Sequence, residues 1–165
     1  ERCDECAEAL KNLKTAYPEI TCLRDVSVSM FEAEKERISN PVCRKRAEHV
    51  IYECDRVLKS IDALANDNLS LFGNLMTASH ASLRDLYEVT GLHLDTMVEE
   101  ALKIDGCIGS RMTGAGFGGC TVSIVQESVV NDFIETVGTN YKKRTGIEPA
   151  FYVSDAADGG REIKE

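Results

Sequence analysis

Tryptophan is absent from this 165-residue sequence, and so is any apolar run approaching the ~20 residues that a membrane-spanning helix needs. No apolar stretch at its start resembles a signal peptide. Positive charge is also scarce, since 19 lysine and arginine residues face 28 acidic ones, for a net charge of −9. Because such a surface repels phosphate backbones and anionic lipids, we expect neither nucleic acid nor a membrane as a partner.

A disulfide framework is not expected either, although the chain has seven cysteines. Their number is odd, and a chain of this length can bury a core without covalent staples. The sequence therefore predicts a reducing, cytoplasmic setting. Cys3 and Cys6 form a single C-x-x-C pair, whereas structural zinc sites take four ligands, usually from two such pairs. We predict no metal site here and place Cys6 in a helical stripe.

The spacing of apolar residues predicts helices over the first two-thirds of the chain. Apolar side chains recur every three to four positions, which is the helical period. Asn40 and Pro41 indicate a helix start, as the cap and the first helical position. The first residues read as a helix already under way, which predicts that the chain was cut from a longer protein. The expected helices cover 3–17 and 27–38, run from Pro41 to Leu64, and carry Phe72–Leu83 and Leu94–Leu102.

After Gly106 the apolar period changes from about 3.6 to 2. Alternation over 108–112 and 120–124 predicts two strands joined by a glycine-rich hairpin. The predicted fold class is α+β in a single domain, 1–165: a helical N-terminal two-thirds, then a strand–loop–strand–helix–strand layer. In that layer the helix carries Val130–Tyr141, Ala150–Ser154 is the last strand, and Ala156–Gly160 is a turn.

Several charged residues are interpreted as ordinary surface groups. The basic runs 44–46 and 142–144 are expected to be solvated parts of helices, the second complementing a helix dipole. Glu99–Glu100 is expected to be a solvated helix face without metal. His49 and His93 are expected at the surface or at its boundary.

Four glycines in six positions make 114–119 the segment most informative about function. Each glycine costs roughly 0.5–1 kcal/mol against alanine in a regular element, and a two-residue turn would join the strands with fewer of them. Such a loop is typical of a backbone that approaches a ligand or needs positive φ angles, and its amides can form an anion-binding nest. A plain tight turn is an equal alternative at this point. Gly114, Gly116 and Gly119 also match G-x-G-x-x-G, but a strand rather than a helix follows them.

The stretch Met112–Cys120, MTGAGFGGC, resembles the third signature of the GHMP kinases, in the form that galactokinases carry. Phe72–Thr90 is similar to a second galactokinase segment, and Phe151–Gly159 is similar to the end of that family. The motifs occur in order and cover nearly the whole chain. The sequence therefore resembles the C-terminal half of a galactokinase.

This resemblance implies the GHMP kinase C-terminal domain, a ferredoxin-like α/β sandwich. It also implies a cytoplasmic enzyme that uses ATP and Mg²⁺ to phosphorylate the anomeric hydroxyl of galactose. The catalytic residues, most metal ligands and the contacts to galactose and ATP are expected in an N-terminal half, so no catalytic residue is assigned here and the chain alone is expected to be inactive. An N-acetylgalactosamine or galacturonate kinase and a non-catalytic galactokinase-like sugar sensor remain alternatives, because the distinguishing contacts lie upstream.

The site residues that the resemblance carries over belong to the glycine-rich loop. The predicted phosphate- and substrate-lining residues are Thr113, Gly114, Ala115, Gly116, Phe117, Gly118 and Gly119, supported by Arg111 and Met112 in the preceding strand. We assign a second group to capping, packing or support rather than to direct catalysis: His80, Arg84, Asp85 and Tyr87.

Overall fold

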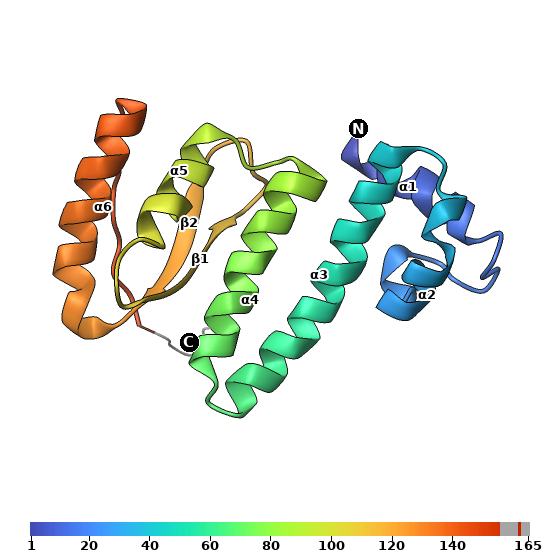
Figure 1. The fold of residues 1–165 in the computed structure, drawn as a ribbon, viewed down its shortest axis with the longest axis horizontal. Coiled ribbons are helices and arrows are strands. Elements are labelled where there is room, and N and C mark those ends of the chain that lie inside the picture. The colour runs from blue at the N-terminus through green and yellow to red at the C-terminus, as the bar shows by residue number, and fades with distance from the viewer. Residues whose placement is uncertain (156–161, 163–165) are drawn as a thin grey trace.

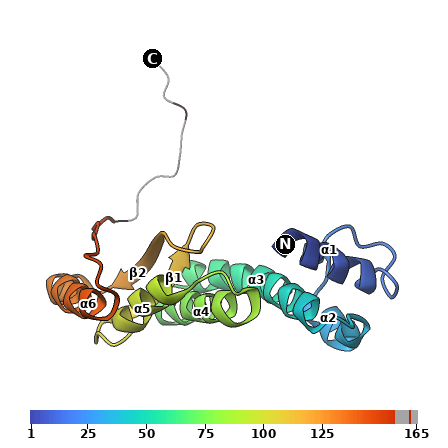
Figure 2. The same cartoon turned by 90° about the horizontal axis from the view of Figure 1, so that it is seen from above.

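The computed structural model describes residues 1–155 and 162. Within this part of the chain, two strands pair antiparallel, β1 (Cys107–Thr113) and β2 (Cys120–Val125). The helices are α1 (Arg2–Leu13), α2 (Val28–Glu34), α3 (Pro41–Ala65), α4 (Leu69–Ser82), α5 (Leu92–Ala101) and α6 (Val130–Thr145). Figures 1 and 2 show α1 and α2 at one end of an elongated molecule and α6 at the other, with α3, α4 and the hairpin between them. No helix among the described residues is long and apolar enough to cross a membrane.

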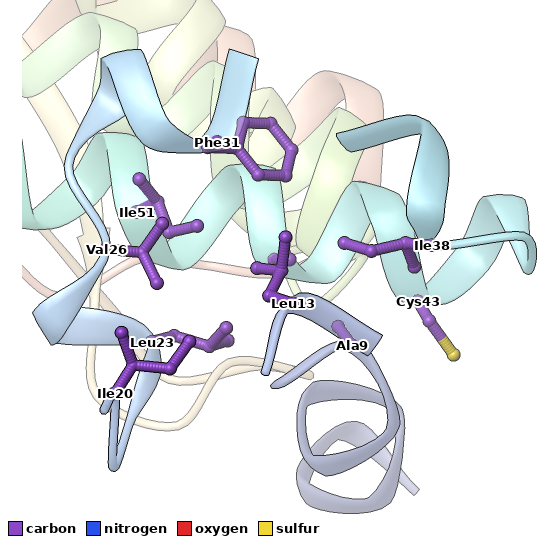
Figure 3. Close-up of a cluster of buried hydrophobic side chains, with 10 residues drawn as sticks. Ala9, Leu13, Ile20, Leu23, Val26, Phe31, Ile38, Cys43 and Ile51 are labelled. Atoms are coloured by element: carbon purple, nitrogen blue, oxygen red, sulfur yellow. The ribbon is translucent and has the colours of Figure 1, made fainter. Parts of the chain in front are cut away.

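The first hydrophobic core joins α1, α2 and α3 (Figure 3). Leu13 and Phe31 are fully buried in it, and Ile51 of α3 completes the contact. The predicted start of α3 is confirmed, because Asn40 Oδ1 accepts a hydrogen bond from the Val42 amide at 2.9 Å and Pro41 takes the first helical position.

The glycine-rich hairpin rests on two other cores. Helix α4 packs closely along β1, where Gly73 and Gly109 bring the two backbones together. Leu83, Leu94 and Met112 form a cluster beneath the loop end of β1. A third cluster fills the space between α5 and α6. The hairpin is therefore presented from a packed base.

The predicted α+β class is confirmed, but the predicted last strand is wrong. Residues 150–154 belong to no strand, and Tyr152 and Val153 are exposed. Phe151 instead packs edge-to-face against Phe133 of α6, with ring centroids 6.4 Å apart. In the described residues the sheet has two strands, since no neighbouring strand pairs with this segment. The predicted turn at 156–160 lies outside the described residues.

The apolar stripe of α3 is buried over only half of its length. Its first part, which includes Ala47 and Ile51, lies in the first core. Its second part projects into solvent, and a typical member, Leu58, is 64% exposed. The exposed stripe consists of Val57, Leu58, Ile61 and Leu64.

Three residues that were expected at the surface or at its boundary are buried. Arg46 of α3 is 2% exposed and forms ion pairs, and His49 bonds through Nδ1 to the Ser82 hydroxyl at 2.8 Å. Glu100 is buried as well, and Arg144 at the end of α6 donates to it at 2.6 Å. The interpretation of these positions as surface groups was therefore wrong, whereas His93 is exposed as expected.

Candidate functional site

The glycine-rich loop connects the last ladder pair, Thr113 and Cys120. Four of its glycines have positive φ angles, and Phe117 also adopts a left-handed φ of 60°. A positive φ in a bulky non-glycine residue is uncommon and strained, and such residues cluster at functional sites. Phe117 is 77% exposed, so side-chain packing among the described residues does not account for its conformation.

The glycines of the loop are required for different reasons. A Cβ at Gly116 would overlap the carbonyl oxygen of Val89, so this position needs glycine for close approach as well as for its φ of 85°. Gly114, with a φ of 87°, has open space around it, and so do Gly118 and Gly119. One glycine thus packs against the domain, whereas a Cβ at any of the other three would project into open space.

The tip of the loop is attached to the domain by one hydrogen bond. The Phe117 amide donates to the carbonyl of Val89 at 2.7 Å. This amide is therefore engaged inside the chain and does not contribute to an anion-binding nest, contrary to the simplest form of that expectation. Thr113, Gly114 and Ala115 are exposed on one arm of the loop, and Gly119 is exposed on the other.

The base of the loop is held by His80. Its Nδ1 accepts a hydrogen bond from the Met112 amide at 3.1 Å, and its Nε2 lies 3.2 Å from Asp95 Oδ1 on α5. Because Nδ1 accepts, the proton of the neutral ring belongs on Nε2, facing the carboxylate. Burial lowers the pKa of His80, although Asp95 opposes the shift. His80 of α4 is therefore a neutral imidazole that bonds to β1 and lies against Asp95 of α5. Its supporting role in the site stays a prediction.

Arg111 connects the same strand to α3. Its Nε donates to the Met112 carbonyl at 3.0 Å, and its Nη1 lies 3.3 Å from Glu53 Oε1. Burial raises the pKa of Glu53, but the Ser79 hydroxyl and the Arg56 and Arg111 guanidinium groups outweigh it and lower the pKa. Glu53 is consequently an anion at neutral pH that ties α3 to α4 and β1.

The remaining supporting residues lie away from the loop. Arg84 and Asp85 pair with each other at 2.8 Å in a largely exposed position. The Tyr87 ring stacks on His49 with centroids 4.5 Å apart, and its hydroxyl lies 4.0 Å from Cys6 Sγ. Of the four predicted supporting residues, His80 bonds directly to the strand that leads into the loop, and Tyr87 packs against the cluster that includes Met112.

Two groups that hold the loop were missed by sequence reasoning. Val89 acts through its main-chain carbonyl, which leaves no side-chain signal. Asp95 lies in the first turn of α5, where an acidic residue is ordinary, so nothing local in the sequence pairs it with His80. No cluster of three or more potential metal ligands occurs in the part of the chain that the structure describes.

The chain is similar to known sugar kinases over nearly its full length. Residues 60–143, just over half of the chain, match the family model described as GHMP kinases C terminal. Galactokinase from Clostridium acetobutylicum is 51% identical over 99% of this chain, and galactokinase from Bacillus subtilis is 46% identical over the same share. The chain spans 42% of the length of each of these relatives.

A solved structure has the same fold. The Lactococcus lactis galactokinase complexed with galactose superposes with a TM-score of 0.88 and 44% sequence identity, covering 92% of this chain and 39% of that one. The matched range 60–143 includes the hairpin, α4 and α5. The chain therefore belongs to the GHMP kinases, as a member of their C-terminal domain family.

Proposed function

We propose that the chain is the C-terminal part of a galactokinase, which transfers the terminal phosphoryl group of ATP to the anomeric hydroxyl of galactose. The observation that carries the proposal is similarity along almost the whole chain to galactokinases, one of which was solved with galactose bound. The seven cysteines are free thiols, which suits a reducing cytoplasm.

The loop supplies backbone rather than side-chain chemistry. Phosphoryl transfer depends mainly on positioning and on stabilising charge, and exposed peptide groups on a held loop can do both. The exposed residues Thr113–Ala115 and Gly119 are the proposed lining of the phosphate and substrate region. Closure of this loop over the reactants excludes water from the transfer.

Magnesium is proposed as part of the MgATP substrate, held by residues outside this chain. The described residues offer no cluster of three potential metal ligands, so no step is assigned to a metal here. The base and the sugar contacts are likewise proposed for the remaining part of the longer protein. The 165-residue chain alone should therefore show no turnover.

The test is a galactose 1-phosphate assay on the longer protein with MgATP. Gly116→Val should lower kcat at least tenfold, because the side chain would overlap the Val89 carbonyl and displace the loop. Gly138→Ala on α6 is the control, because the added Cβ would meet the outer end of the Phe151 ring, a side chain that can move, at 3.3 Å. Wild-type kinetics in Gly116→Val, or turnover of another sugar with none of galactose, would contradict the proposal.

A further inference from the structure

The turn that receives the loop tip has an unusual backbone. A π-helical turn, Leu83–Tyr87, follows α4, and Glu88 then adopts a left-handed φ of 56°. The Val89 amide reaches back to the Leu83 carbonyl at 3.1 Å, while the Val89 carbonyl accepts from the Phe117 amide at 2.7 Å. The place of Phe117 is therefore set by the conformation of residues 86–89.

Carbonyl groups at the end of a helix have no partners within it and must find other donors. In this turn, two arginine side chains supply the donors. Arg46 Nη1 donates to the Leu86 carbonyl, and Arg2 donates to the carbonyls of Tyr87 at 2.7 Å and Glu88 at 3.2 Å. Both guanidinium groups therefore bind the same three-residue turn, and their positive charge suits the negative end of a helix.

Arg46 is the more buried of the two arginines, and its hydrogen bonds fix its position. Its side chain is 2% exposed, and it forms ion pairs through Nε with Glu5 at 2.8 Å and through Nη2 with Glu88 at 2.7 Å. A buried charge is costly unless it is paired and hydrogen-bonded. Three partners from α1 and from the turn satisfy this arginine, so its geometry is fixed from several directions.

We infer that Arg46 is a positioning residue for the glycine-rich loop. Its side-chain hydrogen bonds go to Glu5 and to the turn rather than to the loop. It holds residues 86–88, and this places the Val89 carbonyl where it can accept the Phe117 amide and where Gly116 packs against it. Arg2 assists from α1. That Arg46 fixes the position of the loop is inferred from the contacts alone. That this position matters for catalysis rests on the proposed function.

The test is amide hydrogen exchange, read residue by residue on the 165-residue chain. In the wild type, the Phe117 amide should exchange at least tenfold more slowly than its intrinsic rate, while Gly119 exchanges near its own. Arg46→Lys keeps the charge but cannot bind Glu5, Glu88 and a carbonyl with one planar group. It should raise the Phe117 exchange rate at least tenfold and leave that of Val137, in the core of α6, unchanged.

The loop itself offers a matched pair of variants. Gly116→Ala and Gly114→Ala both place a methyl group at a φ near 86°, but only the former would meet the Val89 carbonyl. Gly116→Ala should therefore remove the Phe117 protection, and Gly114→Ala should retain it. The inference is overturned if Phe117 is unprotected in the wild type, if Arg46→Lys leaves its rate unchanged, or if both glycine variants behave alike.

A general loss of folding would show as faster exchange at Val137. In that event Arg2→Ala decides the matter, because Arg2 begins α1 and its removal deletes the Tyr87 and Glu88 contacts without burying an unpaired charge in α3. Arg2→Ala should raise Phe117 exchange at least threefold with Val137 unchanged. An unchanged Phe117 rate in a folded Arg2→Ala variant overturns the inference.

Kinetics of the longer protein provide the functional readout. Arg46→Lys should lower kcat at least fivefold and change the KM for galactose less than twofold, because the sugar contacts are proposed to lie elsewhere. An unchanged kcat refutes the catalytic role, and so does a rise in KM without a fall in kcat. If the wild-type protein phosphorylates no sugar, the proposed function fails, and the exchange experiment still tests whether Arg46 positions the loop.

Discussion

His49 is a buried titratable residue whose protonation should control stability. It lies between the Ser82 hydroxyl and the face of Tyr87. Burial lowers the pKa of His49 from 6.5 to about 4, with Glu53 opposing and Arg56 adding to the shift. The folded chain therefore keeps this imidazole neutral at a pH where the unfolded chain protonates it.

The sign of the pH dependence follows from this difference. Between pH 6.5 and about pH 4 the unfolded state binds the extra proton, so the free energy of unfolding falls as pH falls. The loss is at most about 1.4 kcal/mol per pH unit and vanishes above pH 6.5. Urea unfolding of the wild type and His49→Gln between pH 7 and pH 5 measures it. The wild type should lose more stability on acidification than the variant, and parallel profiles would disprove this.

The burial of Arg46, His49 and Glu100 could not be deduced from the residues next to them in the sequence. The run Arg44–Arg46 reads as a basic surface strip, yet a helix points consecutive side chains in different directions, so only Arg46 turns inward. Its partners, Glu5 and Glu88, are about forty positions away on either side. A local run of charged residues predicts an exposed surface. An ion pair between residues far apart in the sequence leaves no pattern in the residues around either partner.

Two glycines permit a close approach between the helix α4 and the strand β1. A Cβ at Gly73 would overlap the carbonyl of Ile108, and a Cβ at Gly109 would overlap the backbone of Gly73. Gly73→Ala improves helix propensity by roughly 1 kcal/mol but forces backbone apart, and overpacking typically costs about 1–3 kcal/mol or more. We expect a net loss of about 2 kcal/mol.

Chemical denaturation checks this expectation against a helical glycine with room nearby. Gly138→Ala on α6 meets the Phe151 ring at 3.3 Å, at the far end of a side chain that can move. Its free energy of unfolding should stay within about 1 kcal/mol of the wild type. If Gly73→Ala proves as stable as Gly138→Ala, the close approach of α4 and β1 is not a constraint on the fold.

The elements themselves were largely predictable, because their signals are local. The helical stripes, the Asn40–Pro41 start and the glycine-rich turn between alternating strands each lie within a few residues of sequence. The segment 150–154 alternates too, but a strand exists only where another strand pairs with it. Phe151 packs on α6 while Val153 is exposed, so the alternation there does not mark one buried face.

At the scale of the molecule, four of the exposed large apolar side chains among the described residues line up as the exposed stripe of α3. Val57, Leu58, Ile61 and Leu64 lie on successive turns, and each is 47–64% exposed. Beside Val57 lies a shallow hollow of about 230 Å³ whose walls include Cys54 and Tyr87. Contiguous apolar surface of this kind usually marks an interface. The sequence predicted the apolar stripe, but only the fold separates its buried half from its exposed half.

The stripe should make the isolated 165-residue chain self-associate. Water meets the stripe in this chain, and apolar burial contributes about 25 cal/mol per Å² of apolar surface removed from water. Sedimentation equilibrium at micromolar concentrations should show dimers or larger species, and Leu58→Lys with Ile61→Lys should shift the chain toward monomer. Leu92→Lys is the matched control, because Leu92 is similarly exposed at 65% but lies at the start of α5, outside the stripe. If the double variant still associates, or if Leu92→Lys abolishes association equally, the interface does not lie on α3. A monomeric wild type would show that the stripe is too small to drive assembly by itself.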